Sequence, residues 1–367
     1  MTIIGVVSET LLYLCFSIIL GSFILHIVPK PYRPEINVPK KFLLLSIIGI
    51  AILSITPALQ VILTFYKDIG LGLTIRSVLF TFEVGQAWIV TFILSNILFI
   101  YLILFDIRKK STYSYVGIAF TLALILTLGW SSHASSLTEV SGFIAHTIHF
   151  LAVSIWIGIL LVISWFSSNK ENWLTFLKWF SPVAITCFLV TVGTGLFLMS
   201  LVVDFKDYTN AWMLSYGQAL LIKHLLIIPL LAFAFINSVL MRNQLNKDKE
   251  FNPKPWVKAE SIILLLIFAA TAVLGQQSPP HDIETALATN GPAKLFELLY
   301  QGQIERDLSA FLSFGINSIS LLGLAILFLA LTIFSFVKKA PMVLSFVMSI
   351  LVVLTSYLAL MLSVFLK

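Results

Sequence analysis

The sequence consists largely of apolar runs, each long enough as a helix to cross a lipid bilayer. The hydrocarbon core of a bilayer is about 30 Å across and a helix rises about 1.5 Å per residue, so about 20 apolar residues span it. Ten ranges meet this condition: 6–28, 41–65, 81–105, 114–131, 139–166, 177–202, 215–240, 258–276, 309–336 and 341–366. We therefore expect an all-α fold, a polytopic transmembrane helical bundle of about ten helices. The segment 66–80 is expected to be a loop with a short interfacial piece.

Composition supports the same conclusion. The chain of 367 residues is 59% hydrophobic and 11% charged, whereas soluble domains are about 45–50% apolar and about 25% charged. A soluble fold of this size could not bury so much apolar surface, so the lipid bilayer is the expected partner. Cys15 and Cys187 lie in apolar runs without CxxC spacing, which argues against a disulfide framework and a structural zinc site.

The basic residues predict the orientation of the bundle. The net charge of +6 does not indicate nucleic acid, because Lys and Arg cluster in short loops, where they set membrane topology. Loops on one side hold sixteen of the 23 Lys and Arg: Lys30, Arg33, Lys40, Lys41, Arg108, Lys109, Lys110, Lys170, Lys178, Arg242, Lys247, Lys249, Lys254, Lys258, Lys338 and Lys339. Since cytoplasmic loops carry the excess of Lys and Arg, both termini are predicted to be outside.

Residues 1–367 are predicted to form a single integral membrane domain. The first apolar run has no Lys or Arg before Lys30, so we expect it to be a retained helix rather than a signal peptide. The largest extracellular segment is 277–308, with an amphipathic stretch AKLFELLYQ. No nucleotide-binding Gly-rich loop supports ATP-driven pumping.

Histidines are concentrated near the outer ends of two successive helices, in WSSHASSLTEVSGFIAHTIHFLAVSIWIGIL. His146 and His149 are three residues apart and share a helix face, at depths of roughly 10 and 14 Å. His133 can fold back over the same opening, and Trp156 extends the face inward. Imidazole suits Cu, Zn, Fe and Ni, with Cu(II) bound most tightly. Since ionisable residues in membranes are functional by default, we predict a metal site of His133, His146 and His149. The alternative is that each imidazole hydrogen-bonds a neighbouring Ser, Thr or carbonyl.

The predicted helix 215–240 carries a second pair, Lys223 and His224, about 12–14 Å deep and level with His149. Adjacent residues point about 100° apart, so the two cannot both face one pore. Either they belong to an ion pathway, or Lys223 snorkels outward and His224 packs in the bundle.

Accessory candidates lie at other outer positions. Glu83 could attract cations or simply stabilise a helix N-terminus. Met199 and Met213 flank an outer loop and offer thioethers to Cu(I), although Met more often fills gaps in a core. His281, in SPPHD, is either a first capture ligand or a solvated side chain.

The order of these motifs resembles one membrane protein family. They comprise S-H-A at His133, H-x6-W-x-G from His149 through Trp156 to Gly158, Gly85 with Trp88, Tyr216-Gly217 with Leu220, Lys223 and Asn237, Glu260, and Pro279-Pro280. Over residues 75–281 they are similar to the CopD family of copper resistance and copper uptake membrane proteins.

The resemblance implies copper movement across, or handling at, the bacterial cytoplasmic membrane, usually as uptake, by a multi-pass permease rather than an enzyme. It implies that His133 and His149 contact copper, whereas His146 rests on helix geometry. Some relatives carry a fused CopC-type domain, so a separate CopC-type extracellular copper-binding protein is an expected partner.

Two alternatives stay open. A b-type haem redox or electron-transfer protein would use axial histidines, for which His149 and His224 are at equal depth. A copper-delivery or copper-sensing factor would bind the metal without transporting it.

Overall fold

A computed structural model describes residues 3–280, 282–300, 302 and 309–367 of the chain. It divides into two compact units, an N-terminal unit Ile3–Leu201 and a C-terminal unit Val202–Lys367. Within the described residues, ten helices are long and apolar enough to cross a membrane. The predicted all-α transmembrane fold is therefore confirmed.

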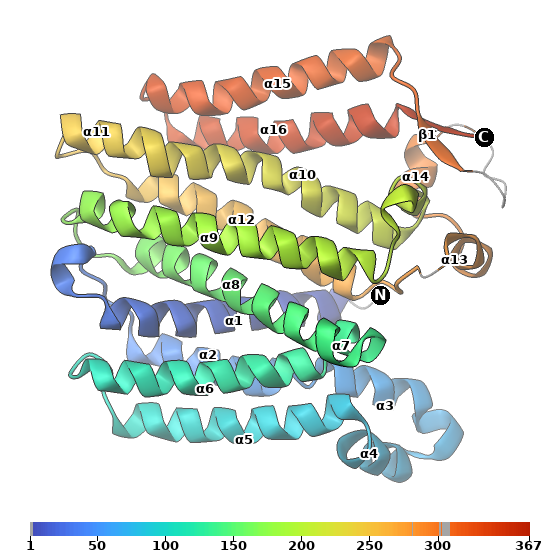
Figure 1. Ribbon diagram of the computed structural model, residues 1–367, viewed down its shortest axis with the longest axis horizontal. Coiled ribbons are helices and arrows are strands. Elements are labelled where there is room, and N and C mark those ends of the chain that lie inside the picture. Colours follow the sequence, from blue (N-terminus) through green and yellow to red (C-terminus); the bar gives the residue numbers. More distant parts are fainter. Residues whose placement is uncertain (1–2, 281, 301, 303–308) are drawn as a thin grey trace. The chain divides into compact units, whose positions relative to one another are not determined.

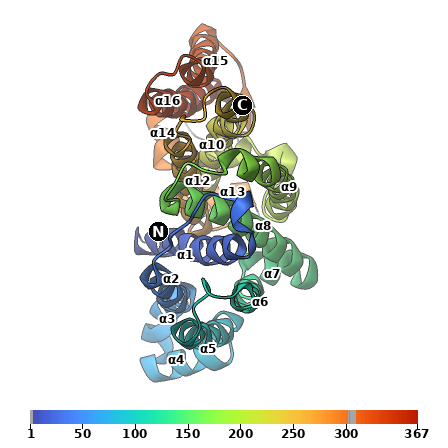
Figure 2. The same cartoon turned by 90° about the vertical axis from the view of Figure 1, so that its left-hand side faces the viewer.

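The N-terminal unit is built from long helices that run alongside one another (Figures 1 and 2). Its elements are α1 (Ile3–Ile27), η1 (Lys30–Tyr32), α2 (Lys40–Leu53), α3 (Thr56–Ile69), α4 (Leu71–Phe80), α5 (Glu83–Leu104), α6 (Ser111–Trp130), α7 (His133–Leu137), α8 (Glu139–Phe166) and α9 (Trp173–Ser200). The long apolar run at 139–166 stays one helix, as predicted, and packs between α1 and α9.

Helices α1 and α8 cross with their backbones in contact. A Cβ atom on Gly158 would lie 2.3 Å from the carbonyl oxygen of Ser17, and one on Gly21 would lie 2.2 Å from the carbonyl oxygen of Gly158. Without a hydrophobic driving force between helices in lipid, such small residues allow the close van der Waals packing that holds helices together. Gly158 of the H-x6-W-x-G motif thus has a packing role.

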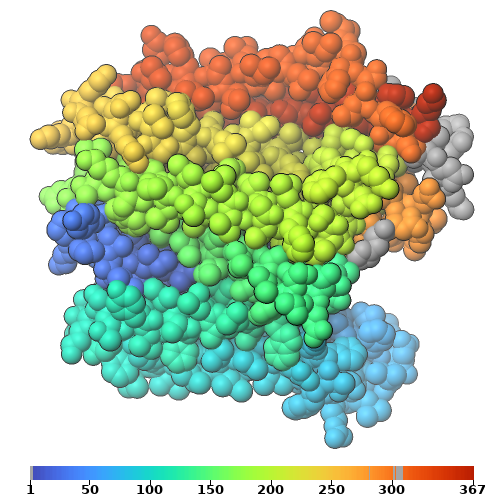
Figure 3. All heavy atoms as spheres, in the orientation of Figure 1, coloured from blue at the N-terminus to red at the C-terminus, as the bar shows by residue number. Residues whose placement is uncertain are grey.

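The predicted helix 41–65 is interrupted. Helix α2 ends at Leu53, and α3 begins at Thr56 with Pro57 in its first turn, where the missing proline N–H removes no helical hydrogen bond. The segment 66–80 is more helical than predicted: α3 continues to Ile69, Gly70 turns the chain at φ 82°, and α4 follows. Figure 3 shows this α3–α4 hairpin (light blue) projecting past the end of α5.

The C-terminal unit contains four membrane-length helical segments and two small strands (Figure 1). Its elements are η2 (Phe205–Asp207), η3 (Asn210–Met213), α10 (Ser215–Phe235), the π-helical turn η4 (Ile236–Leu240), α11 (Met241–Lys247), α12 (Lys254–Gly275), α13 (Ile283–Asn290), α14 (Lys294–Leu299), β1 (Ala310–Leu312), α15 (Ile316–Val337), α16 (Met342–Met361) and β2 (Val364–Leu366). Strands β1 and β2 pair antiparallel, so the predicted helices 309–336 and 341–366 are too long at these ends.

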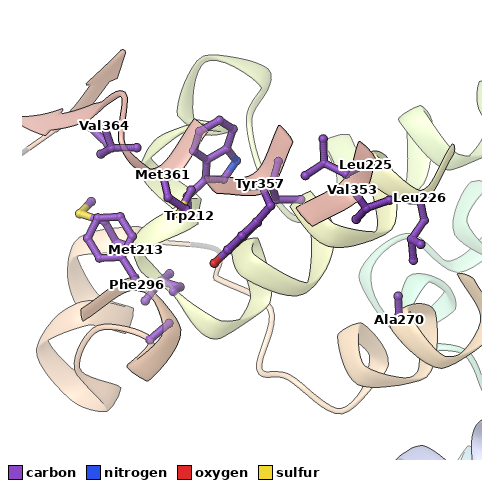
Figure 4. Packing of buried hydrophobic residues seen from close by; sticks show 14 of the residues in the cluster. Trp212, Met213, Leu225, Leu226, Ala270, Phe296, Val353, Tyr357, Met361 and Val364 are labelled. Atoms are coloured by element: carbon purple, nitrogen blue, oxygen red, sulfur yellow. The ribbon is translucent and has the colours of Figure 1, made fainter. Parts of the chain in front are cut away.

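A dense apolar cluster lies at the β1–β2 end of this unit (Figure 4). Phe296 of α14, within the predicted loop segment 277–308, inserts into it and is 1% exposed. The Tyr357 hydroxyl donates to the buried Gln218 side chain, whose amide in turn donates to the carbonyl oxygen of Trp212 at 2.5 Å. This network ties α16 to α10 and satisfies polar groups that would be costly inside a membrane.

Candidate metal site

His133 is the first residue of the short helix α7 and is exposed. The Ser132 side chain caps α7 by accepting a hydrogen bond from the Ser135 backbone N–H at 3.2 Å. Helix α7 packs on the first turns of α8 so closely that a Cβ on Gly142 would lie 1.9 Å from the Ala134 carbonyl oxygen. The backbone of α7, which begins at His133, is therefore held next to the start of α8, and the fold-back of the His133 side chain stays a prediction.

His146 is half-buried on α8. Its Nδ1 atom is buried and has no hydrogen-bond partner in the structure. A buried polar atom left without a partner costs about 1–3 kcal/mol. The alternative interpretation, a hydrogen bond to a neighbouring Ser, Thr or carbonyl, is therefore not observed for this nitrogen. A bound ligand would remove the free-energy cost of leaving it unpaired.

His149 lies one turn deeper and contacts α9. Its Nδ1 is 3.0 Å from the hydroxyl oxygen of Thr194, and that hydroxyl lies 2.6 Å from the Val190 carbonyl oxygen, to which it donates. Because a hydroxyl has one hydrogen, the Thr194 oxygen accepts from Nδ1–H of His149. In the neutral imidazole this places the lone pair on Nε2, the form in which histidine ligates metals.

The α8–α9 interface continues inward from His149. A Cβ on Gly195 would lie 3.3 Å from Cε1 of the His149 ring, so the glycine leaves space for the imidazole. Further in, Trp156 packs edge-on against Phe188 with ring centroids 5.9 Å apart, and its buried Nε1 has no partner in the structure. Met199 is buried near the end of α9.

In the C-terminal unit, His224 pairs with a residue that was not predicted. The Tyr208 hydroxyl lies 2.7 Å from Nδ1 of His224, and burial raises the pKa of Tyr208 to about 12. Lys223, next to His224, is half-buried. Met213 is 1% exposed within the apolar cluster of Figure 4, so in this structure its side chain fills core space.

The remaining candidates are separate from these contacts. Glu83 is exposed in the first turn of α5, and His281 lies outside the described residues. Within the part of the chain that is described, no three His, Cys, Asp or Glu side chains are gathered into a group able to hold a metal ion. The predicted three-histidine site is thus not preassembled here, and His149 and His224 belong to different units.

Comparison with known proteins finds one matching family model and one similar curated protein. Residues 174–274, covering α9, α10 and most of α12, match the family model of Copper resistance protein D, CopD. Over these residues the chain is similar to the CopD family. It is also 26% identical over 296 residues to the Copper transport protein CutJ of Bacillus subtilis (strain 168), which covers 75% of this chain and 53% of that protein. The chain thus spans about half the length of this curated relative. No solved structure matches it.

Several CopD motif residues make structural contacts. A Cβ on Gly85 would lie 1.9 Å from the Val78 carbonyl oxygen, and one on Gly217 would lie 1.9 Å from that of Ala211. The Trp88 indole N–H donates to the Ala51 carbonyl at 3.1 Å. These motif positions therefore support helix packing.

Sequence reasoning missed the partners of the histidines. Thr194 lies in the glycine-containing run TVGTG, and Tyr208 lies in a connecting loop. A polar residue within an apolar helix was the available signal for Thr194. Nothing in the sequence pairs Tyr208 with His224, because their contact depends on how the loop folds back over α10.

Proposed function

We propose that this protein moves copper ions inward across the bacterial cytoplasmic membrane. Three observations support the proposal: the CopD match, the similarity to a protein named for copper transport, and ten membrane-length helices. The proposal is assigned to specific residues by the two histidines of α8. His146 has an unpaired buried nitrogen, and the hydrogen bond to Thr194 sets the tautomer of His149.

We propose that copper is captured at the α7–α8 end of the N-terminal unit. His149 offers Nε2, His146 offers its unpaired Nδ1, and His133 joins when α7 adjusts over the first turns of α8. Such a site suits copper because imidazole nitrogen is a borderline ligand and Cu(II) has the highest affinity in its series. Trp156 and Met199 in the N-terminal unit, and Lys223 and His224 in the C-terminal unit, are proposed accessory positions for the ion. Glu83 and His281 would attract or receive the ion outside.

The proposed orientation places both termini and the α7–α8 end outside. Ten crossings bring the two termini to one side, and the Lys- and Arg-rich loops belong in the cytoplasm. By family resemblance, a CopC-type extracellular protein would deliver the ion to His133. The driving force would be a gradient, the membrane potential or delivery by this partner.

Copper binding by the purified protein tests the site. We expect replacement of both His133 and His149 by Ala to weaken binding at least tenfold, because two of three nitrogen ligands are lost. His26→Ala is the matched control, since the His26 Nδ1 is engaged with the Ser22 carbonyl oxygen at 2.6 Å on α1. Unchanged stoichiometry and affinity in the double variant would show that the assignment is wrong.

The same preparation tests the two alternatives, which stay predictions. A Soret band in the visible spectrum would favour b-type haem over copper. Copper binding without copper movement into vesicles would favour a delivery or sensing factor.

A further inference from the structure

A carboxyl group is buried in a membrane helix of the C-terminal unit. Glu260 lies on α12, and only 4% of its surface is exposed. Of the acidic side chains that the structure describes, it alone falls among the buried residues. Transferring an isolated carboxylate into an apolar medium is so costly that the group normally takes up a proton or finds a cation.

The partner of Glu260 is an amide and not a cation. The Asn237 Nδ2 donates to a Glu260 carboxyl oxygen at 2.7 Å and also to the Trp256 carbonyl oxygen at 3.3 Å. No ion pair to Glu260 is present among the described side chains. Its negative charge would therefore be uncompensated in this arrangement.

The elements around Glu260 carry eight other ionisable side chains. Helix α12 packs against α10 and α16. Their ionisable side chains, with those of α11 and of α12 itself, are Tyr216, Lys223, His224, Arg242, Lys247, Lys254, Lys258 and Tyr357. Lys258 is two residues before Glu260 and points about 200° away around the helix, and His224 is about 20 Å from Asn237 along α10. Tyr357 is already paired with Gln218.

The backbone at Asn237 is irregular. It lies in the π-helical turn η4, where α10 passes into α11, and single π-turns inside helices are frequent at functional sites. The Asn237 Oδ1 is buried and has no hydrogen-bond partner. The amide thus offers a donor to a carboxylate and an acceptor to a protonated carboxyl, so it can pair with Glu260 in either state.

We propose that Glu260 is a proton-carrying group that couples copper movement to proton movement, an inference that rests on the proposed function. In the loaded state one proton is bonded to a carboxyl oxygen of Glu260, and the group is neutral. In the other state that O–H bond has broken, the proton has passed to water, and the carboxylate carries one negative charge. No electron is transferred.

The position of Glu260 indicates where the proton is exchanged. It lies six residues after Lys254, the first residue of α12, which corresponds to about 9 Å along the helix. Lys247, Lys249 and Lys254 lie at or within the connection between α11 and α12, and this is the proposed cytoplasmic end. A proton leaving Glu260 would enter water on that side.

Infrared spectroscopy tests the proton site without copper. The purified full chain should show the C=O stretching band of a protonated carboxylic acid, and the band should disappear as pH is raised. Glu260→Gln keeps the size of the side chain and an amide partner for Asn237 but cannot titrate, so this band should be lost. Glu284→Gln, at an exposed position on α13, should keep it. A band that persists in Glu260→Gln would overturn the proton site.

Proton movement in vesicles tests the coupling. With the wild-type chain and external copper, we expect copper entry into vesicles together with a change in internal pH. The copper-dependent pH change should be at least tenfold smaller with Glu260→Gln than with the wild-type chain. With Glu284→Gln it should equal that of the wild type. An unaltered pH change in Glu260→Gln would overturn the coupling. If the wild-type chain moves no copper, the proposed transport function fails, and the infrared band still decides whether Glu260 holds a proton.

Discussion

Replacing Thr194 by Val probes the link between the α9 hydroxyl and copper binding by His149. Valine has nearly the shape of threonine, so the α8–α9 packing is preserved while the acceptor for the His149 Nδ1–H, 3.0 Å away, is removed. The imidazole then loses both its fixed tautomer and its orientation. If the proposed site is correct, copper affinity should fall although no ligand has been changed.

The size of the effect follows from one hydrogen bond. A typical net contribution of about 0.5–1.5 kcal/mol corresponds to a factor of about two to ten in affinity. Loss of an outer partner of a metal-ligating histidine typically costs about 10–100-fold. We therefore expect Thr194→Val to weaken copper binding about tenfold, or about 1.4 kcal/mol.

The assay is a copper titration of the purified protein in competition with a chelator. Thr186→Val is the matched control, because Thr186 is exposed on the same helix, and its affinity should equal that of the wild type. Equal affinities of Thr194→Val and wild type would refute the role of the Thr194–His149 bond. If His149→Ala also bound copper normally, His149 would be excluded as a ligand.

Two further predictions concern packing and pH. Gly158→Ala places a Cβ 2.3 Å from the Ser17 carbonyl oxygen. Because neither backbone can yield, the free energy of unfolding should fall by about 1–3 kcal/mol, which thermal unfolding in detergent measures. Gly193→Ala is the control that should not be destabilised, because its Cβ would meet nothing within 4 Å. Burial raises the pKa of Tyr208 to about 12, above its ordinary value of 10.0, so the folded protein holds this proton more tightly and its stability should fall between pH 10 and pH 12. Tyr208→Phe should flatten that fall in a pH series of unfolding curves, and an identical fall in the variant would show that another group is responsible.

The membrane fold could be predicted from the sequence because each span is marked by its own local composition. The run 139–166 needed no tertiary information, since 28 apolar-rich residues make one helix wherever it packs. The β1–β2 pair could not be predicted in this way, because Ala310–Leu312 is apolar and its strand conformation depends on Val364–Leu366, far away in the chain.

In the candidate site, too, local features could be predicted from the sequence and tertiary contacts could not. The helical spacing of His146 and His149 is local and could be read directly, as could the position of His133 before α8. Which nitrogen of His149 carries the hydrogen depends on Thr194, 45 residues away, and no local pattern contains that information. Asn237 and Glu260 were both recognisable as motif residues, but their hydrogen bond follows from how α10 and α12 pack.

The copper content of cells tests whether this protein moves copper inward. Bacterial cells producing the wild-type chain, the His133→Ala and His149→Ala double variant, or no such protein would be grown with added copper, washed and analysed by elemental mass spectrometry. Inward transport predicts more copper in cells with the wild-type chain than in the other two. Equal or lower copper in the wild-type cells would contradict inward movement by this protein.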